Sequence, residues 1–251
     1  MGALGAALTA APPLPEPAGY SVFVDERAAF GIANFWNVVS NAPFLLVGAW
    51  GLYVLARSRP EAFVEREEKW AYAVCFLAVA LIALGSSYYH LAPLEEGRLM
   101  WDRLPMGIGF MAVLSAVIAE RVSLGAGVRS LVPLVVAGVA SVLYWRWSEL
   151  RGAENIVPYA VVQYGALLAI VVIAVLHPSR YTRGADVFVA VAIYALAKIA
   201  ELLDGRIYSL GAVVSGHTLK HLLAALAIGW LVRMLQLRTP ISRPSSAHPT
   251  R

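Results

Sequence analysis

Seven apolar stretches, each close to the roughly 20 residues that a helix needs to cross a bilayer, dominate this chain. They cover residues 35–56, 70–90, 101–119, 128–147, 156–176, 185–204 and 216–237. Lipid offers no water to the backbone, so each stretch is expected to form a helix rather than an open strand. The sequence therefore predicts an all-α, polytopic membrane protein, folded as a seven-transmembrane-helix bundle.

Composition supports this prediction and excludes other classes. Of the 251 residues, 59% are hydrophobic and 14% are charged, whereas a soluble domain has about 45–50% apolar and about 25% charged residues. A soluble globular protein and a disordered chain are both excluded. Short connectors rich in Gly, Pro and charge separate the apolar stretches, so residues 19–238 are expected to form one membrane domain. Residues 1–18 and 239–251 are expected to be flexible tails.

The distribution of Lys and Arg predicts the orientation of the bundle. If the N-terminus lies outside, the inside segments carry twelve of these residues, the outside segments carry five, and three lie within spans. The chain is therefore predicted to be N-out/C-in. No basic run or patch indicates nucleic acid, so the expected partners are the bilayer and its lipids. The single cysteine, Cys75, excludes an intrachain disulfide.

Three histidines lie near the outer ends of two predicted spans. His90 is close to the end of the second span, and His217 and His221 begin the seventh, four residues apart and so on one helix face. In the predicted topology the second span runs outward and the seventh runs inward, which places all three imidazoles at one depth. Ionisable groups inside a membrane are functional candidates by default. Three neutral imidazoles with an open fourth position are the ligand set of a catalytic zinc.

Other roles for the histidines remain open. Imidazoles inside membranes also form hydrogen bonds between helices. Haem is a further alternative, but two axial ligands must approach opposite faces of the porphyrin, which a pair on one helix face does not allow. The shortage of carboxylates argues against magnesium or calcium at this site.

Asp102 and Ser86 are the candidate catalytic groups beside the histidines. Asp102 begins the third span at the same outer side, and Ser86 lies one turn before His90. A carboxylate near a metal can hold a water molecule and accept its proton, and a serine hydroxyl can donate to a developing oxyanion. Alternatively, Asp102 stabilises a helix N-terminus beside Arg103, and Ser86 bonds back to a carbonyl.

A second polar cluster lies in the sixth span. Lys198 and Glu201 are i, i+3 neighbours there, Asp204 follows them, and Lys220 faces them from the seventh span. The preferred interpretation is an ion-paired network that braces the histidine site. The alternative is an ion or proton pathway through Lys198, Glu201 and Asp204.

The segment 25–41 combines Asp25 and Glu26 with three asparagines, Asn34, Asn37 and Asn41. The asparagines could cap the first helix or bond across to neighbouring spans. With Asp25 and Glu26 they could also supply oxygen ligands to a hard cation such as calcium.

Four motifs, FWNVVSN, GSSYYH, DRLPM and SGHTLKH, occur here in the order in which they stand in alkaline ceramidases. Over roughly residues 25–238 the chain resembles that family, part of a seven-span superfamily with the progestin/adipoQ receptors and hemolysin III-like proteins. The SxxxH, Asp and HxxxH elements mark the superfamily. The FWN..SN element and the Leu-Pro-Met after the aspartate resemble the ceramidase branch.

The resemblance implies roles for the five candidate residues. His90, His217 and His221 would bind Zn²⁺, Asp102 would be the acid that works with the zinc-bound water, and Ser86 would lie near the metal. The implied reaction is hydrolysis of the amide bond of ceramide or another N-acyl lipid, giving a fatty acid and a sphingoid-type amine. The alternative is a receptor-like protein with a structural zinc and no turnover.

The chain also departs from the family pattern. Eukaryotic members carry a calcium site before the first span, with a glutamate where this chain has Asn34. Asp25 and Glu26 remain as candidate calcium ligands with Asn34, but the acid-Trp pattern that precedes them is absent. Arg103 follows the aspartate where many members carry an acid, a difference that could alter headgroup preference. The Ala-rich, Arg-over-Lys composition suggests a bacterial genome, and with the predicted orientation it places the site on the periplasmic side of an inner membrane.

Overall fold

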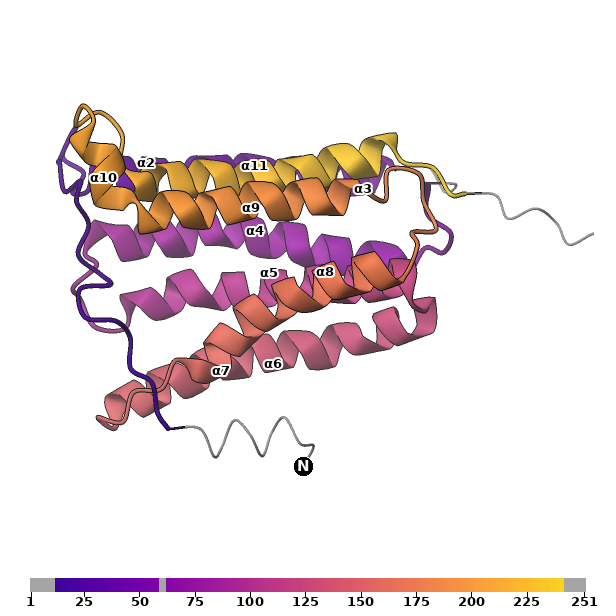
Figure 1. The fold of residues 1–251 in the computed structure, drawn as a ribbon, viewed down its shortest axis with the longest axis horizontal. Coiled ribbons are helices and arrows are strands. Elements are labelled where there is room, and N and C mark those ends of the chain that lie inside the picture. The colour runs from indigo at the N-terminus through magenta and orange to yellow at the C-terminus, as the bar shows by residue number, and fades with distance from the viewer. Residues whose placement is uncertain (1–11, 59–61, 242–251) are drawn as a thin grey trace, which may run out of the picture.

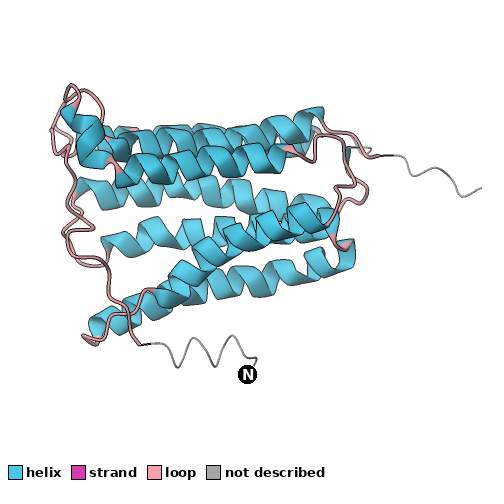
Figure 2. Ribbon diagram, viewed as in Figure 1, coloured by secondary structure: helices cyan, strands magenta, loops and turns pink. Residues whose placement is uncertain are grey.

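The structure, a computed structural model, describes residues 12–58 and 62–241. Within these ranges the chain forms helices joined by loops and no β-strand (Figure 2). The prediction of an all-α protein is therefore confirmed for this part of the chain. Residues 1–11 and 242–251, which belong to the two predicted tails, lie outside the described residues.

The long helices run side by side along one direction (Figure 1). They are α3 (Ala42–Arg57), α4 (Glu68–Leu91), α5 (Arg98–Arg121), α6 (Leu124–Leu150), α9 (Asp186–Leu202) and α11 (Gly216–Leu237). The short helices α2 (Phe35–Val39) and α10 (Asp204–Ser209) precede α3 and α11. The fifth predicted span is composite, because α7 (Val157–Ala160) and α8 (Ala166–Leu176) are joined by a π-helical turn, η2 (Val161–Gly165).

Six helical segments of the described chain are long and apolar enough to cross a membrane. They are Phe35–Arg57, Glu68–Leu91, Arg98–Arg121, Leu124–Leu150, Val157–Leu176 and Gly216–Leu237. The remaining predicted span, 185–204, corresponds to α9, which has 17 residues and is shorter than the roughly 20 that a bilayer requires. The protein is thus an integral, multi-pass membrane protein, and the seventh crossing and the orientation stay predictions.

The order of packing brings the first and the last long helices together. Helix α4 packs between α3 and α5, α5 packs on α6 and α8, and α11 packs on both α9 and α3. The largest apolar cluster lies among α3, α4, α5 and α11 and includes Phe44, Phe76, Val79, Ala112 and Val232. Many large apolar side chains on the outside of the bundle are exposed, such as Leu46, Val132 and Leu168. An apolar surface of this extent is what a membrane-embedded protein presents to lipid.

Two glycines let helices approach closely beside the predicted site. A Cβ atom on Gly85 of α4 would lie 2.1 Å from the carbonyl oxygen of Trp101 on α5. A Cβ atom on Gly216, the first residue of α11, would lie 2.0 Å from the carbonyl oxygen of Ala200 on α9. Any other residue at either position would force the helices apart.

The two ends of the bundle are closed by different polar contacts. At the histidine end, where α4 ends and α11 begins, the N-terminal segment crosses the bundle. The carbonyl of Leu14 accepts from the amide of Ile156 at 2.9 Å, and Glu16 forms an ion pair with Arg103. At the opposite end, Arg238 donates to Glu120 at 2.6 Å in a buried ion pair.

Candidate metal centre and cavity

Three histidine side chains converge at the histidine end of the bundle. His90 lies in the last turn of α4, and His217 and His221 lie in the first two turns of α11. One ring nitrogen of each lies within 4.8 Å of the others, and all three side chains are buried. The Nε2 atoms of His90 and His217 are 3.3 Å apart. The predicted meeting of the three imidazoles is therefore confirmed.

Neighbouring groups orient these rings. The Nδ1 atom of His221 lies 2.8 Å from the hydroxyl of Ser40, which leaves its Nε2 atom free to act as a ligand. The carboxylate of Asp204 accepts from the backbone amide of His217 at 2.7 Å and so holds the start of α11. The ring of Phe23 packs over His90 and His217, with ring centroids 4.7 and 4.4 Å away. Neither Ser40 nor Phe23 was identified as a site residue from sequence.

The donor set fits a zinc ion. Two nitrogens bound tetrahedrally to zinc lie roughly 3.3 Å apart, given Zn–N bonds of about 2.0–2.1 Å, and the His90 and His217 Nε2 atoms have this separation. Among the described residues, Nδ1 of His90 is buried without a hydrogen-bond partner. A neutral His90 ring that carries its proton on this Nδ1 presents an unprotonated Nε2, the nitrogen that faces His217, as the ligand atom.

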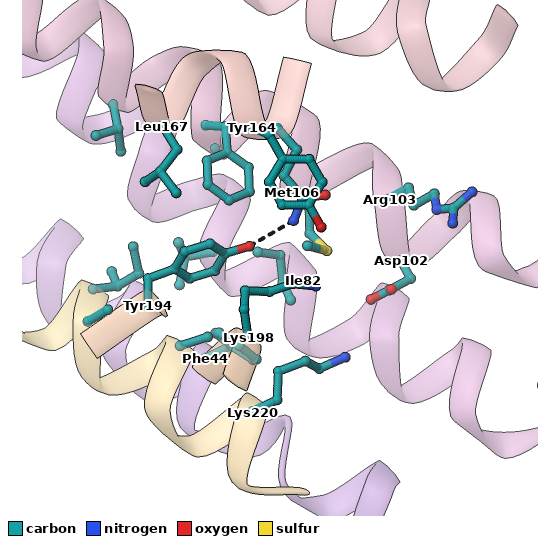
Figure 3. Close-up of a pocket in the computed structure, with 18 of the residues that line it drawn as sticks. Phe44, Ile82, Asp102, Arg103, Met106, Tyr164, Leu167, Tyr194, Lys198 and Lys220 are labelled. Carbon is teal, nitrogen blue, oxygen red and sulfur yellow. Dashed lines mark hydrogen bonds between the residues drawn. The ribbon is translucent and has the colours of Figure 1, made fainter. Parts of the chain in front are cut away.

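Asp102 and Ser86, the two predicted catalytic groups, lie in the wall of one cavity with His221. Both are buried. Gly85, next to Ser86, sits against the backbone of Trp101 and Asp102, so the close packing of α4 on α5 sets the distance between the two candidate groups. In Figure 3 the carboxylate of Asp102 faces the amino group of Lys220, and the side chain of Arg103 points away.

The predicted ion network forms and reaches the histidines. Lys198 pairs with Glu201, and Nζ of Lys220 lies 3.0 Å from Oε1 of the same glutamate. That ammonium is also 3.0 Å from Nε2 of His217. Asp204 lies outside the network, because its carboxylate bonds the amides of His217 and Val24. Its role is to position α11.

Two of the three N-terminal asparagines bond across to neighbouring segments, which was one of the three roles left open. Asn34 donates to the carbonyl of His90 at 2.9 Å and Asn37 to the carbonyl of Asp25 at 3.0 Å, whereas Asn41 donates within its own segment, to the carbonyl of Asn37 at 2.8 Å. The carbonyl bonded by Asn34 belongs to one of the candidate zinc ligands. These amides therefore tie the first helix to the site.

The candidate calcium ligands do not form an oxygen cage in this arrangement. Both carboxylate oxygens of Asp25 accept from the guanidinium of Arg27, at 2.8 and 2.7 Å. These hydrogen bonds hold the pKa of the Asp25 carboxyl below its usual value. Glu26 is exposed, and the Asn34 amide nitrogen is engaged with His90. Asp25, Glu26 and Asn34 as placed do not fit a calcium ion.

A cavity of about 210 Å³ extends from the histidine end into the bundle. Its wall is polar near the histidines, where it is lined by Ser86, Asp102, Lys198, Glu201, Lys220 and His221. Farther along the same helices the wall becomes apolar, with Val79, Ile82, Phe110, Leu167, Val191 and Ile228. The cavity therefore has the polarity of an amphiphile, with a polar end at the candidate metal centre.

Comparison with known proteins agrees with this geometry. The family model described as Ceramidase matches residues 28–247, a range that contains the three histidines, Ser86 and Asp102. No curated protein matches the chain.

Proposed function

The chain belongs to the ceramidase family, and on that premise we propose that it is a zinc-dependent amidohydrolase of the membrane. Its substrate is ceramide or a similar N-acyl lipid, which it cleaves to a fatty acid and a sphingoid-type amine. One observation carries the proposal: three buried imidazoles meet, and one of them, His221, lines the polar end of a cavity whose other end is apolar.

His90, His217 and His221 would hold the metal. Zinc bound there supplies a Lewis acid that polarises the amide carbonyl and lowers the pKa of a water molecule toward about 7. Asp102 accepts the proton of the attacking water and delivers it to the leaving nitrogen as the C–N bond breaks. Ser86 donates a hydrogen bond to the carbonyl oxygen as negative charge develops on it. The products are a carboxylic acid and an amine.

Lys220 has a positioning role in this scheme. Its ammonium is held by Glu201 and stands between His217 and Asp102. Because a metal would take the Nε2 atom of His217, Lys220 would keep its bond to Glu201 and face the carboxylate of Asp102. The network thus keeps a positive charge beside the group that handles the proton.

The cavity accounts for the lipid nature of the substrate. The amide lies at the polar end, and the acyl chain occupies the apolar part between α5, α8, α9 and α11. Tyr164 lines the cavity and is also 49% exposed on the outside of the bundle, which supports entry of lipid from the side, between η2 and α9. With the predicted N-out orientation, the reaction takes place near the periplasmic face of a bacterial inner membrane.

The test compares three proteins purified in detergent: wild type, His217→Ala and His177→Ala. Each is assayed for bound zinc and for fatty acid released from a panel of N-acyl lipids. We expect about one zinc and turnover in wild type, loss of both in His217→Ala, and no change in His177→Ala, whose histidine ends α8 at the opposite end. Equal release by wild type and His217→Ala would reject the mechanism. Zinc without turnover of any lipid would favour the receptor-like alternative.

A further inference from the structure

The cavity contains a second polar pair, separate from the histidines. Nε2 of Gln163 on η2 donates a hydrogen bond to the phenol oxygen of Tyr194 on α9 at 2.7 Å, the dashed line in Figure 3. Both residues line the cavity. Tyr194 lies one helical turn before Lys198, on the same face of α9 and on the side away from the metal centre.

The surroundings of this pair are apolar. The ring of Phe110 packs edge-on against Tyr194, with centroids 5.4 Å apart, and Leu167 and Met106 lie around the pair in Figure 3. Polar groups in such surroundings cost free energy unless they are hydrogen-bonded. Within the described residues, the hydrogen bond between Gln163 and Tyr194 is the only one that either side chain makes. Each therefore retains unused hydrogen-bonding capacity.

The unused groups have a definite chemistry. Because the Tyr194 oxygen accepts from Gln163, its O–H is left as a donor and Oε1 of Gln163 is left as an acceptor. If the amide is rotated by 180°, the amide N–H groups become the free donors and the phenol oxygen becomes the free acceptor. In both cases the pair offers at least one donor and one acceptor. A hydroxyl on a lipid chain both donates and accepts, so it can use the two groups at once.

The backbone at Gln163 supports a functional role. Residues Val161–Gly165 form a π-helical turn within an otherwise α-helical segment. Such turns are rare and occur frequently at functional sites. This turn carries Gln163 and Tyr164, which both line the cavity.

We propose that Gln163 and Tyr194 form a hydroxyl subsite, and that the preferred substrates are N-acyl lipids with a hydroxyl on the acyl chain. The inference rests on the proposed function, which places the amide at Asp102. Phe110, which contacts Tyr194, stands two turns beyond Asp102, about 12 Å along α5. The subsite therefore lies on the acyl side of the amide, where the chain would otherwise meet only apolar wall. A hydroxyl near the middle of the acyl chain would replace the missing partners.

The test uses matched pairs of N-acyl lipids that differ only in a mid-chain hydroxyl on the acyl chain. The measured quantity is the ratio of kcat/KM for the hydroxylated lipid to that for the plain lipid. We expect a ratio of about five to ten in wild type, the effect of one or two neutral hydrogen bonds. Tyr194→Phe and Gln163→Leu should bring the ratio close to one. Tyr144→Phe, which removes a phenol hydroxyl from the exposed face of α6, should keep the wild-type ratio.

A purely structural role for the pair would lower both rates together and leave the ratio unchanged. A ratio near one in wild type, or an unchanged ratio in both variants, would overturn the proposal. If wild type hydrolyses no lipid, the proposed function fails and the subsite is tested by binding. Wild type should then bind a mid-chain hydroxy fatty acid about five times more tightly than the plain acid, and Tyr194→Phe should bind the two equally. Equal affinities in wild type would refute the subsite.

Discussion

The Nε2 atoms of His90 and His217 face each other at 3.3 Å, although the two residues are 127 positions apart in the chain. Two neutral imidazoles at this distance can share a single proton, or both nitrogens can face a cation. The third ring, His221, turns its Nδ1 to Ser40 and leaves its Nε2 for the same cation. The end of α4 and the start of α11 are therefore joined by a candidate metal site.

Removal of the metal should lower the stability of the bundle. A zinc ion that binds only the folded protein adds RT ln(1 + [Zn]/Kd) to the free energy of unfolding, about 4 kcal/mol at 1,000 times Kd. We expect dialysis against a chelator to lower the Tm and added zinc to restore it. The measurement is thermal unfolding in detergent. His90→Ala should show no response to the chelator, and a wild-type Tm that is insensitive to it would contradict zinc binding.

Asp102→Asn should separate metal binding from catalysis. The amide keeps the shape of the side chain but cannot accept the proton, so kcat for lipid hydrolysis should fall about 10²- to 10⁴-fold. Zinc content should stay at the wild-type value, since the ligands are the histidines. Asp186→Asn is the matched control, because Asp186 pairs with Arg183 at the start of α9, away from the histidine end of the bundle. Wild-type activity in Asp102→Asn would remove Asp102 from the mechanism.

Gly85→Ala should disturb the site without altering any candidate ligand. The new Cβ would lie 2.1 Å from the Trp101 carbonyl oxygen, so α4 and α5 must separate and shift Ser86 relative to Asp102. We expect lower activity and a destabilisation of about 1–3 kcal/mol, as for overpacking. Gly229→Ala on α11 is the control, because its Cβ would meet its nearest neighbour at 3.8 Å. The loss of stability is measured as Tm and the loss of activity as kcat. Equal Tm and kcat values for the two variants would argue against close packing at Gly85.

Arg238→Met should destabilise the opposite end of the bundle. Arg238 bonds to Glu120 at 2.6 Å and to the hydroxyl of Tyr72 at 3.3 Å, and both members of the ion pair are buried. Loss of one partner from a buried pair leaves the other charge unpaired, at a cost of about 3–5 kcal/mol. Arg233→Met, on the exposed face of the same helix, should have little effect. Chemical or thermal unfolding would measure the difference, and an equal Tm in the two variants would rule out this contribution.

The pair of Asp25 and Arg27 should make stability depend on pH at the acid end. The hydrogen bonds from Arg27 hold the pKa of Asp25 below its usual value, which is about 3.9. The pair therefore stabilises the protein above about pH 4, and this contribution is lost as the pH falls through the lowered pKa. Since Arg27 is 45% exposed, solvent screening should keep the contribution small.

The check is the Tm of wild type and Asp25→Asn between about pH 7 and pH 2.5. The variant should be less stable at pH 7, and the two curves should converge at low pH. Glu26→Gln, which changes an exposed neighbour, should follow wild type. A constant gap across this range would show that the carboxylate charge is not responsible.

Much of the helical architecture could be predicted from the lengths of the apolar stretches. The stretches 70–90 and 216–237 became α4 and α11 almost unchanged, because in lipid a continuous apolar run has only one way to satisfy its backbone. The π-helical turn at Val161–Gly165 and the shortness of α9 were not predicted. Both depend on how neighbouring helices pack. An apolar stretch has the same composition whether its helix is regular or contains a π-helical turn, and whether it is long or short.

The features of the candidate site also fall into two groups, those that local spacing predicts and those that only the packing of the helices creates. The i, i+4 spacing of His217 and His221 places them on one face whatever surrounds the helix, so their pairing could be read from the chain. The contacts of Ser40 with His221, and of Phe23 with His90, join residues that no spacing relates. Nothing in the sequence predicted the Gln163–Tyr194 pair, since a lone glutamine and a lone tyrosine in apolar stretches match no motif.

The sequence alone indicated that this chain is a membrane protein and which segments are helical, and it predicted that three histidines and an aspartate lie at one depth. These properties follow from local periodicity and from the cost of polar groups in a membrane. Only the tertiary structure decided that the imidazoles meet within reach of one ion, that Lys220 reaches His217, and that a cavity with a polar pair in its wall lies beneath them. Those relationships depend on helix rotation and close approach, which Gly85 and Gly216 permit but which only the packed bundle sets.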